Sequence, residues 1–232
     1  MKIGIFGDSF AKLKRNSTPS WVDILSEKYD ITNHAISGSN LYYSIEEIKK
    51  HHEEYDKIIF VVTQPGRLQI ADFLDVGEEK HKQFFSSIRD YKILNPSKVK
   101  NLWENAVKEA AIQYFMYLQN YKYDYYIHNL MLTDVQELRS DIVLIPSFKD
   151  SCNNSTIDSM FEIHLNENAA WGLPDTSRII EKYQDSRNCH MTAENNSIFA
   201  DKAVTWINGA PVHIDLDDFV TTTNKDLYLK LL

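Results

Sequence analysis

A serine, a histidine and several polar residues stand at places in this sequence where they could catalyse acyl transfer. Ser9 stands three residues after the apolar run at residues 2–6 ends, and His190 stands near the other end of the 232-residue chain. A serine hydroxyl becomes a nucleophile when an imidazole accepts its proton, and N–H groups then stabilise the negative oxygen that forms. We therefore ask which elements could bring Ser9, His190 and such donors together.

Four short apolar runs predict the strands of a parallel sheet. They lie at residues 2–6, 29–35, 57–63 and 141–146. Apolar runs without polar alternation are typical of strands that are buried on both faces. Because helical segments separate these runs, the sequence predicts an α/β sandwich around a parallel sheet.

Helices are expected between and after the strands. Thr18-Pro19 predicts the start of one helix, and a capping box from Ser44 to Glu47 predicts the start of a second. Residues 101–121 and 124–138 predict two more. Thr192 is expected to cap a last helix that reaches residue 207, with an inward face formed by Phe199, Ala203 and Trp206.

The chain is predicted to form one domain, residues 1–232. Residues 69–138 are too many for a simple crossover between two strands, so we expect a helical insertion or cap there. Six tyrosines lie within it, at positions 114, 117, 121, 123, 125 and 126. They are typical either of a helical hairpin with tyrosine in its core, or of an aromatic face for sugar rings or for a second subunit of a homodimer.

Ligands bind parallel α/β sheets at the carboxyl ends of the strands, and this rule selects the candidate site. The residues at these ends are Ser9, then Gly38, then Thr63, Gln64 and Arg67, while Asp185 and His190 precede the last helix. Arg67 could bind an anionic group of a substrate or pair with an acid such as Asp72. A hydroxyl, an imidazole, a carboxylate and several amide donors together indicate acyl transfer through a serine.

Three segments, in order, resemble the sequence blocks of the SGNH or GDSL-like hydrolases. Gly7-Asp8-Ser9 resembles the first block, and NHAISGS at residues 33–39 resembles the second, with Gly38 as its glycine. His190 before a helix resembles the last block, so the resemblance spans residues 2 to about 208. It implies a three-layer α/β/α fold with a flavodoxin-like sheet, the SGNH hydrolase fold, and esterase or acetylhydrolase activity.

The resemblance also implies roles for individual residues. Ser9 would be the nucleophile and His190 the base, and the N–H groups of Ser9 and Gly38 would line the oxyanion hole. The aspartate that the family has three residues before its histidine is Arg187 here. Asp185, five residues before His190, could orient the imidazole. The alternatives are a Ser–His dyad, the Asn188 side chain or the Cys189 carbonyl.

The third block of the family, Gly-x-Asn-Asp, is also altered. The corresponding segment here reads TQPGR at residues 63–67. Gln64 has the same amide chemistry as the missing asparagine, and Thr63 or Arg67 could substitute instead.

The expected activity is hydrolysis of a carboxylic ester, such as an O-acetyl group on a carbohydrate, through an acyl-enzyme. The alternatives are an O-acyltransferase on the same machinery, or a non-catalytic binding or structural protein. No cofactor is expected. We expect no metal site either, because His34 stands at no metal-ligand spacing and His51-His52 is typical of a solvated helix end.

Composition narrows the partners. A net charge of −8 and a pI near 5.5 argue against nucleic acid as a partner. Two cysteines are too few for a disulfide scaffold, and no apolar run reaches the roughly 18–20 residues of a membrane span. Asp8 interrupts the first apolar run too early for a signal peptide, so a cytoplasmic protein is expected.

Overall fold

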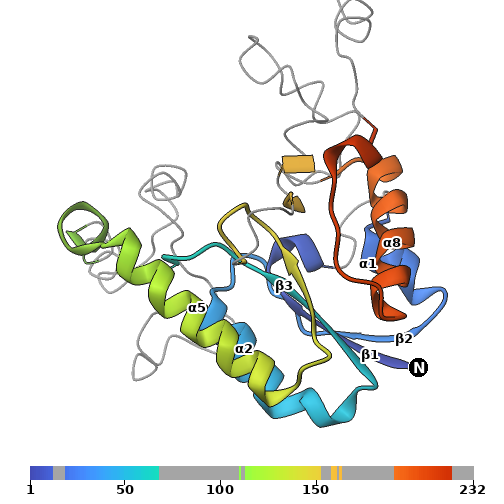
Figure 1. Ribbon diagram of the computed structural model, residues 1–232, viewed down its shortest axis with the longest axis horizontal. Helices are drawn as coiled ribbons and strands as arrows, with labels where there is room; N and C mark the ends of the chain where they lie inside the picture. The colour runs from blue at the N-terminus through green and yellow to red at the C-terminus, as the bar shows by residue number, and fades with distance from the viewer. Residues whose placement is uncertain are drawn as a thin grey trace, which may run out of the picture.

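A computed structural model describes residues 1–12, 19–67, 110, 113–152, 158–160, 162–163 and 191–220 (Figure 1). Its centre is an all-parallel, four-stranded sheet in the order β2-β1-β3-β4. The strands are β1 (Lys2–Gly7), β2 (Asp30–Asn33), β3 (Lys57–Val62) and β4 (Val143–Pro146). All four predicted strands are confirmed, with small differences at their ends.

Strand β1 lies inside the sheet and pairs with β2 on one side and with β3 on the other. Ile5 pairs with Asn33 of β2 on one side and with Ile59 of β3 on the other. Since all the strands run the same way, the segments that follow β1, β2, β3 and β4 emerge at one edge of the sheet. Of the residues predicted to do chemistry, Ser9, Gly38, Thr63, Gln64 and Arg67 lie in these segments.

Helices flank both faces of the sheet, as Figure 1 shows: α1 (Trp21–Ser26) and α8 (Ala193–Ile207) on one, α2 (Leu41–His51) and α5 (Tyr121–Leu138) on the other. Alternate strand residues enter two separate apolar cores. Ile5 and Ile59 pack in the core under α1 and α8. Phe6 and Phe60 pack in the core under α2 and α5. This period of two is what a strand buried on both faces requires.

Two helices begin at different residues from those predicted. Helix α1 is capped by Ser20 rather than by Thr18, because the Ser20 and Asp23 side chains form a reciprocal capping box. Helix α2 is capped by Asn40, whose Oδ1 accepts the Tyr43 N–H at 2.9 Å. The predicted cap Ser44 therefore lies one turn inside α2.

The predicted helix over residues 101–121 falls largely outside the described residues. Its described end is a π-helical turn, Tyr114–Leu118, and Asn120 then caps α5, so the helix predicted from residue 124 begins three residues earlier. Leu132 and Val135 of α5 are buried in the core with Phe60. This part of the expected insertion thus packs on the sheet itself.

The last helix is confirmed as predicted. Thr192 caps α8, and Phe199, Ala203 and Trp206 are buried. A buried amide joins α8 to α1: Asn196 Oδ1 accepts the Trp21 N–H at 2.9 Å, and its Nδ2 donates to the Met191 carbonyl at 3.0 Å. In the described part of the chain, no helix has the length and apolarity needed to cross a membrane.

We expect Asn196→Ala to lower the free energy of unfolding by about 2–3 kcal/mol. The substitution leaves the buried N–H of Trp21 and the buried carbonyl of Met191 without their hydrogen-bond partner. Urea unfolding followed by tryptophan fluorescence measures the loss. Asn208→Ala is the matched control: its Nδ2 also bonds a helix carbonyl, that of Val204, but at an exposed helix end. It should cost under about 0.5 kcal/mol. Equal losses in the two variants would show that the α1–α8 bridge contributes nothing of its own.

Candidate active site

Ser9 follows the central strand at the carboxyl edge of the sheet. It is partly exposed and begins a short 3₁₀ turn, Ser9–Ala11. Two residues earlier Gly7 has φ of 138°, and a Cβ built on it would lie 2.4 Å from the Val61 carbonyl oxygen of β3. Only glycine fits where β1 and β3 approach so closely, and this approach sets the direction in which the chain leaves for Ser9.

Asp8 anchors the turn from beneath. Its side chain is 0% exposed, and Oδ1 accepts the Phe10 N–H at 3.0 Å and the Ser147 hydroxyl at 3.2 Å. Its Oδ2 lies 3.3 Å from Nη2 of Arg67. The carboxylate therefore points into the protein, where it ties the segments after β1, β3 and β4 together.

Arg67 completes this buried cluster. Its side chain is 8% exposed, its Nη1 donates to the Ser39 carbonyl at 2.7 Å, and its guanidinium lies 5.6 Å from the centre of the Phe148 ring. Of the two predicted roles for Arg67, these contacts support pairing with an acid. The acid is Asp8, while the suggested partner Asp72 lies outside the described residues.

The loop that carries Gly38 is fastened to the end of β1. The Ile36 N–H and the Ser39 hydroxyl both donate to the Gly7 carbonyl, each at 3.0 Å. Gly38 itself has φ of 78°, and a Cβ built there would meet no atom within 4 Å. The space that a side chain at Gly38 would occupy is therefore open.

Two hydroxyls near this edge are buried without a hydrogen bond among the described residues. They belong to Thr63, which follows β3 and is 2% exposed, and to Ser37 in the Gly38 loop. A buried hydroxyl without a partner is costly, and it is commonly found where a ligand or an ordered water completes a site. The structure thus brings Ser9, Gly38, Thr63 and Gln64 to the same edge.

The predicted base and its orienting residue cannot be located in the same way. His190 and Asp185 lie outside the described residues, as do Arg187, Asn188 and Cys189. The described chain resumes at Met191, which is buried in the apolar core that also holds Phe10, the neighbour of Ser9.

A pocket of about 220 Å³ opens beside these loops, between the start of α2, the segment after β3 and α5. Its described lining includes Gln64, Arg67, Asn40, Tyr114, Tyr123, Asp124 and His128. Ser9, Gly38 and Thr63 are not among the lining residues. The pocket therefore adjoins the Ser9 edge through Gln64 and Arg67.

His128 is a residue of this pocket that the sequence reasoning missed. Its Nε2 lies 2.8 Å from the Ser151 carbonyl, which can only accept, so Nε2 carries the proton. Burial lowers the pKa of His128 and keeps the ring neutral, with its lone pair on Nδ1. The signal was the spacing of four residues from Asp124, which places both side chains on one face of a helix.

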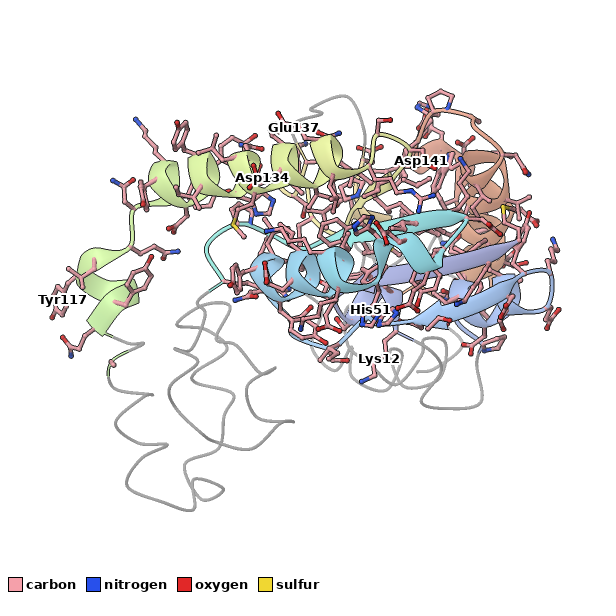
Figure 2. All side chains as sticks on the ribbon, turned by 90° about the horizontal axis from the view of Figure 1, so that it is seen from below. Lys12, His51, Tyr117, Asp134, Glu137 and Asp141 are labelled. Atoms are coloured by element: carbon pink, nitrogen blue, oxygen red, sulfur yellow. The ribbon has the colours of Figure 1, made fainter. Side chains whose placement is uncertain are left out.

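Tyrosines cover the outer face of the pocket region. Tyr117, labelled in Figure 2, lies on the turn before α5 and is 69% exposed; Tyr123 and Tyr126 are each 61% exposed. Tyr114 and Tyr125 are only partly exposed, and most of the expected hairpin lies outside the described residues, so both interpretations of the tyrosine cluster stay predictions. Tyr121 is half-exposed as well, and its hydroxyl donates to Asp150 at 2.6 Å.

No protein-family model matches the sequence, and a search of the curated proteins finds no significant match. The resemblance to the SGNH hydrolases therefore depends on the three sequence segments, and the structure supplies the α/β fold and the positions around Ser9.

We expect Arg67→Met to lower the free energy of unfolding by about 3–5 kcal/mol, because it leaves the Asp8 carboxylate buried without its cation. Denaturant unfolding by circular dichroism measures this loss. In Lys28→Met the exposed ion pair with Asp201 is removed instead, and the cost should stay below about 1 kcal/mol. A loss for Arg67→Met as small as that of Lys28→Met would contradict a buried, structural pair.

Proposed function

We propose that the protein is a serine hydrolase of the SGNH type that cleaves a carboxylic ester through an acyl-enzyme, with Ser9 as nucleophile and His190 as base. The observation that carries the proposal is the position of Ser9. It stands at the carboxyl end of the central strand, with Gly38 and Thr63-Gln64 in the segments that follow the two neighbouring strands. This is the edge at which parallel α/β proteins bind their ligands.

The path of the chain into α8 supports His190 as the base. Met191 is buried with Phe10 and Ala11 in one apolar core, and Asn196 holds the Met191 carbonyl. Met191, which follows His190 in the sequence, therefore lies in the same core as two residues of the Ser9 turn.

The proposed reaction proceeds in two halves. The Ser9 hydroxyl attacks the ester carbonyl carbon while His190 takes its proton, and the carbonyl oxygen becomes an oxyanion. The N–H groups of Ser9 and Gly38 stabilise this oxyanion, with the Gln64 amide or the Thr63 hydroxyl as a third donor. The alcohol then leaves with the proton of His190. Water then attacks the acyl-enzyme carbonyl while His190 takes its proton. The acid is released, and the proton returns from His190 to the Ser9 oxygen.

The adjoining pocket supports a carbohydrate as the alcohol part of the ester. Asn40 and Gln64 offer amides, Asp124 offers a carboxylate, and Tyr114 and Tyr123 offer aromatic rings with hydroxyls. Such groups bind sugar hydroxyls and stack on sugar faces. An O-acetyl group on a glycan is the substrate class that suits this lining.

Two alternatives use the same residues differently. An O-acyltransferase would replace the attacking water with a sugar hydroxyl, and the same pocket could hold that acceptor. A non-catalytic binding protein is favoured by two features of the sequence: Arg187 at the position of the family aspartate, and the altered third block at residues 63–67.

Labelling with a fluorophosphonate, followed by mass spectrometry of the modified peptide, tests the activated serine. We expect the label on Ser9 in the wild type and none in Ser9→Ala. In His190→Ala, labelling should be about 10²–10⁴-fold slower, because the base that activates the hydroxyl is gone. Hydrolysis of p-nitrophenyl acetate should fall in parallel.

The matched controls are Ser26→Ala and His213→Ala, which remove an exposed serine and an exposed histidine. Both should label at the wild-type rate. A folded wild type that takes up no label, or takes it up elsewhere than Ser9, would overturn the proposed hydrolase. Acyl transfer to added sugars instead of water would identify the acyltransferase.

A further inference from the structure

Two histidines and a glutamate lie together between the end of β2 and helix α2, away from the pocket described above. His34 follows β2, whereas Glu47 and His51 occupy successive turns of α2, where Figure 2 labels His51. Glu47 Oε2 lies 4.0 Å from His34 Nδ1 and 3.9 Å from His51 Nε2. One ligand atom from each of the three residues can be chosen so that all three lie within 4.8 Å of one another.

The outer nitrogen of each imidazole is already held. His51 Nδ1 lies 2.7 Å from Glu54 Oε1, and His34 Nε2 lies 2.6 Å from the Tyr55 hydroxyl. A carboxylate can only accept, so Nδ1 of His51 carries a proton and, in the neutral ring, Nε2 turns its lone pair toward Glu47. Imidazoles whose second nitrogen is fixed by a carboxylate or another polar group are the usual form of histidine ligands to metals.

The two carboxylate oxygens of Glu47 face different neighbours. Its Oε1 accepts from Lys50 Nζ at 2.9 Å, whereas Oε2 faces the two histidines. A carboxylate oxygen directed at the lone pair of a neutral imidazole is unfavourable unless a cation lies between them.

We propose that His34 Nδ1, Glu47 Oε2 and His51 Nε2 bind one divalent transition-metal ion, for which zinc is the best fit. Two imidazoles and one carboxylate oxygen are a ligand set that zinc accepts, with water in a fourth position. The His51 side chain is 32% exposed, so the fourth position is open to solvent.

The two distances to Glu47 require small movements, whereas the two imidazole nitrogens, which lie within 4.8 Å of each other, require a larger one. Tetrahedral zinc with bonds of about 2.0–2.1 Å holds its ligand atoms about 3.3–3.5 Å apart, so each distance to Glu47 must shorten by about 0.5 Å. The two imidazoles stack at 4.7 Å with planes 25° apart, so both rings must turn for their nitrogens to bind one ion. The ion would then fasten α2 to β2, the elements on either side of the Gly38 loop.

The sequence analysis expected no metal here. The spacing of Glu47 and His51 places them on one helical face, but His34 is distant in the sequence and joins them only through the fold. The proposal is independent of the proposed hydrolase, and binding rather than activity tests it.

Isothermal titration of the full chain with zinc chloride tests the site. We expect one ion per chain in the wild type, and binding at least about tenfold weaker in Glu47→Gln and in His51→Ala, which remove ligands. His52→Ala is the matched control, because it removes the adjacent histidine, which is outside the cluster, and it should bind as the wild type does. Glu54→Ala, which releases the outer nitrogen of His51, should also weaken binding about tenfold.

Thermal unfolding gives a second readout. Zinc at 100 times its dissociation constant should raise the wild-type Tm by about 5–10 °C, and the rise should be lost in His51→Ala. Circular dichroism without metal checks that each variant folds. No binding to the wild type would overturn the proposal. So would binding that Glu47→Gln and His51→Ala both leave unchanged, which would place the ion on other residues.

Discussion

The buried ion pair between Asp8 and Arg67 is the contact on which the candidate site depends most. Removing two charges from water is costly, and the cost is recovered only when further hydrogen bonds satisfy them. Here Oδ1 of Asp8 accepts from the Phe10 N–H and the Ser147 hydroxyl, and Oδ2 lies 3.3 Å from Arg67 Nη2. The Ser39 carbonyl accepts from the guanidinium. The segments after all four strands are therefore held by one charged cluster. The proposed nucleophile stands directly beside it, on backbone that has little freedom to move.

The sheet could be predicted from the sequence because a strand buried on both faces leaves a local signal, an unbroken apolar run. The starts of α1 and α2 could not be predicted, because several possible capping residues stand close together there. Ser44 and Asn40 are both good caps, and local chemistry does not rank them. Packing decides: Leu41 is buried in the core with Phe6, so the helix must begin before it and Asn40 becomes the cap. Thr192 was identified correctly as the cap of α8.

The candidate site likewise has a part that could be predicted from the sequence and a part that could not. Ser9, Gly38 and Gln64 could be grouped from the sequence because parallel strands deliver their carboxyl ends to one edge. The partner of Arg67 could not, since Asp72 is close in sequence while Asp8 is close only in space. The closeness of His34 to Glu47 and His51 could not be predicted for the same reason, because the stacking of His34 on Phe6 and on His51 follows from the packing of α2 against β1.

The bond between Asn196 and Trp21 also bears on how the chain is made. Its two residues are 175 positions apart, so α1 is synthesised long before the helix that covers it. At about 5–20 residues per second, Trp21, Val22 and Leu25 wait roughly 10–35 s for α8. During that interval one face of the young sheet is open, and the nascent chain has an apolar surface that a chaperone could shield. The folding of this half of the molecule is thus completed only when its last described helix has been synthesised.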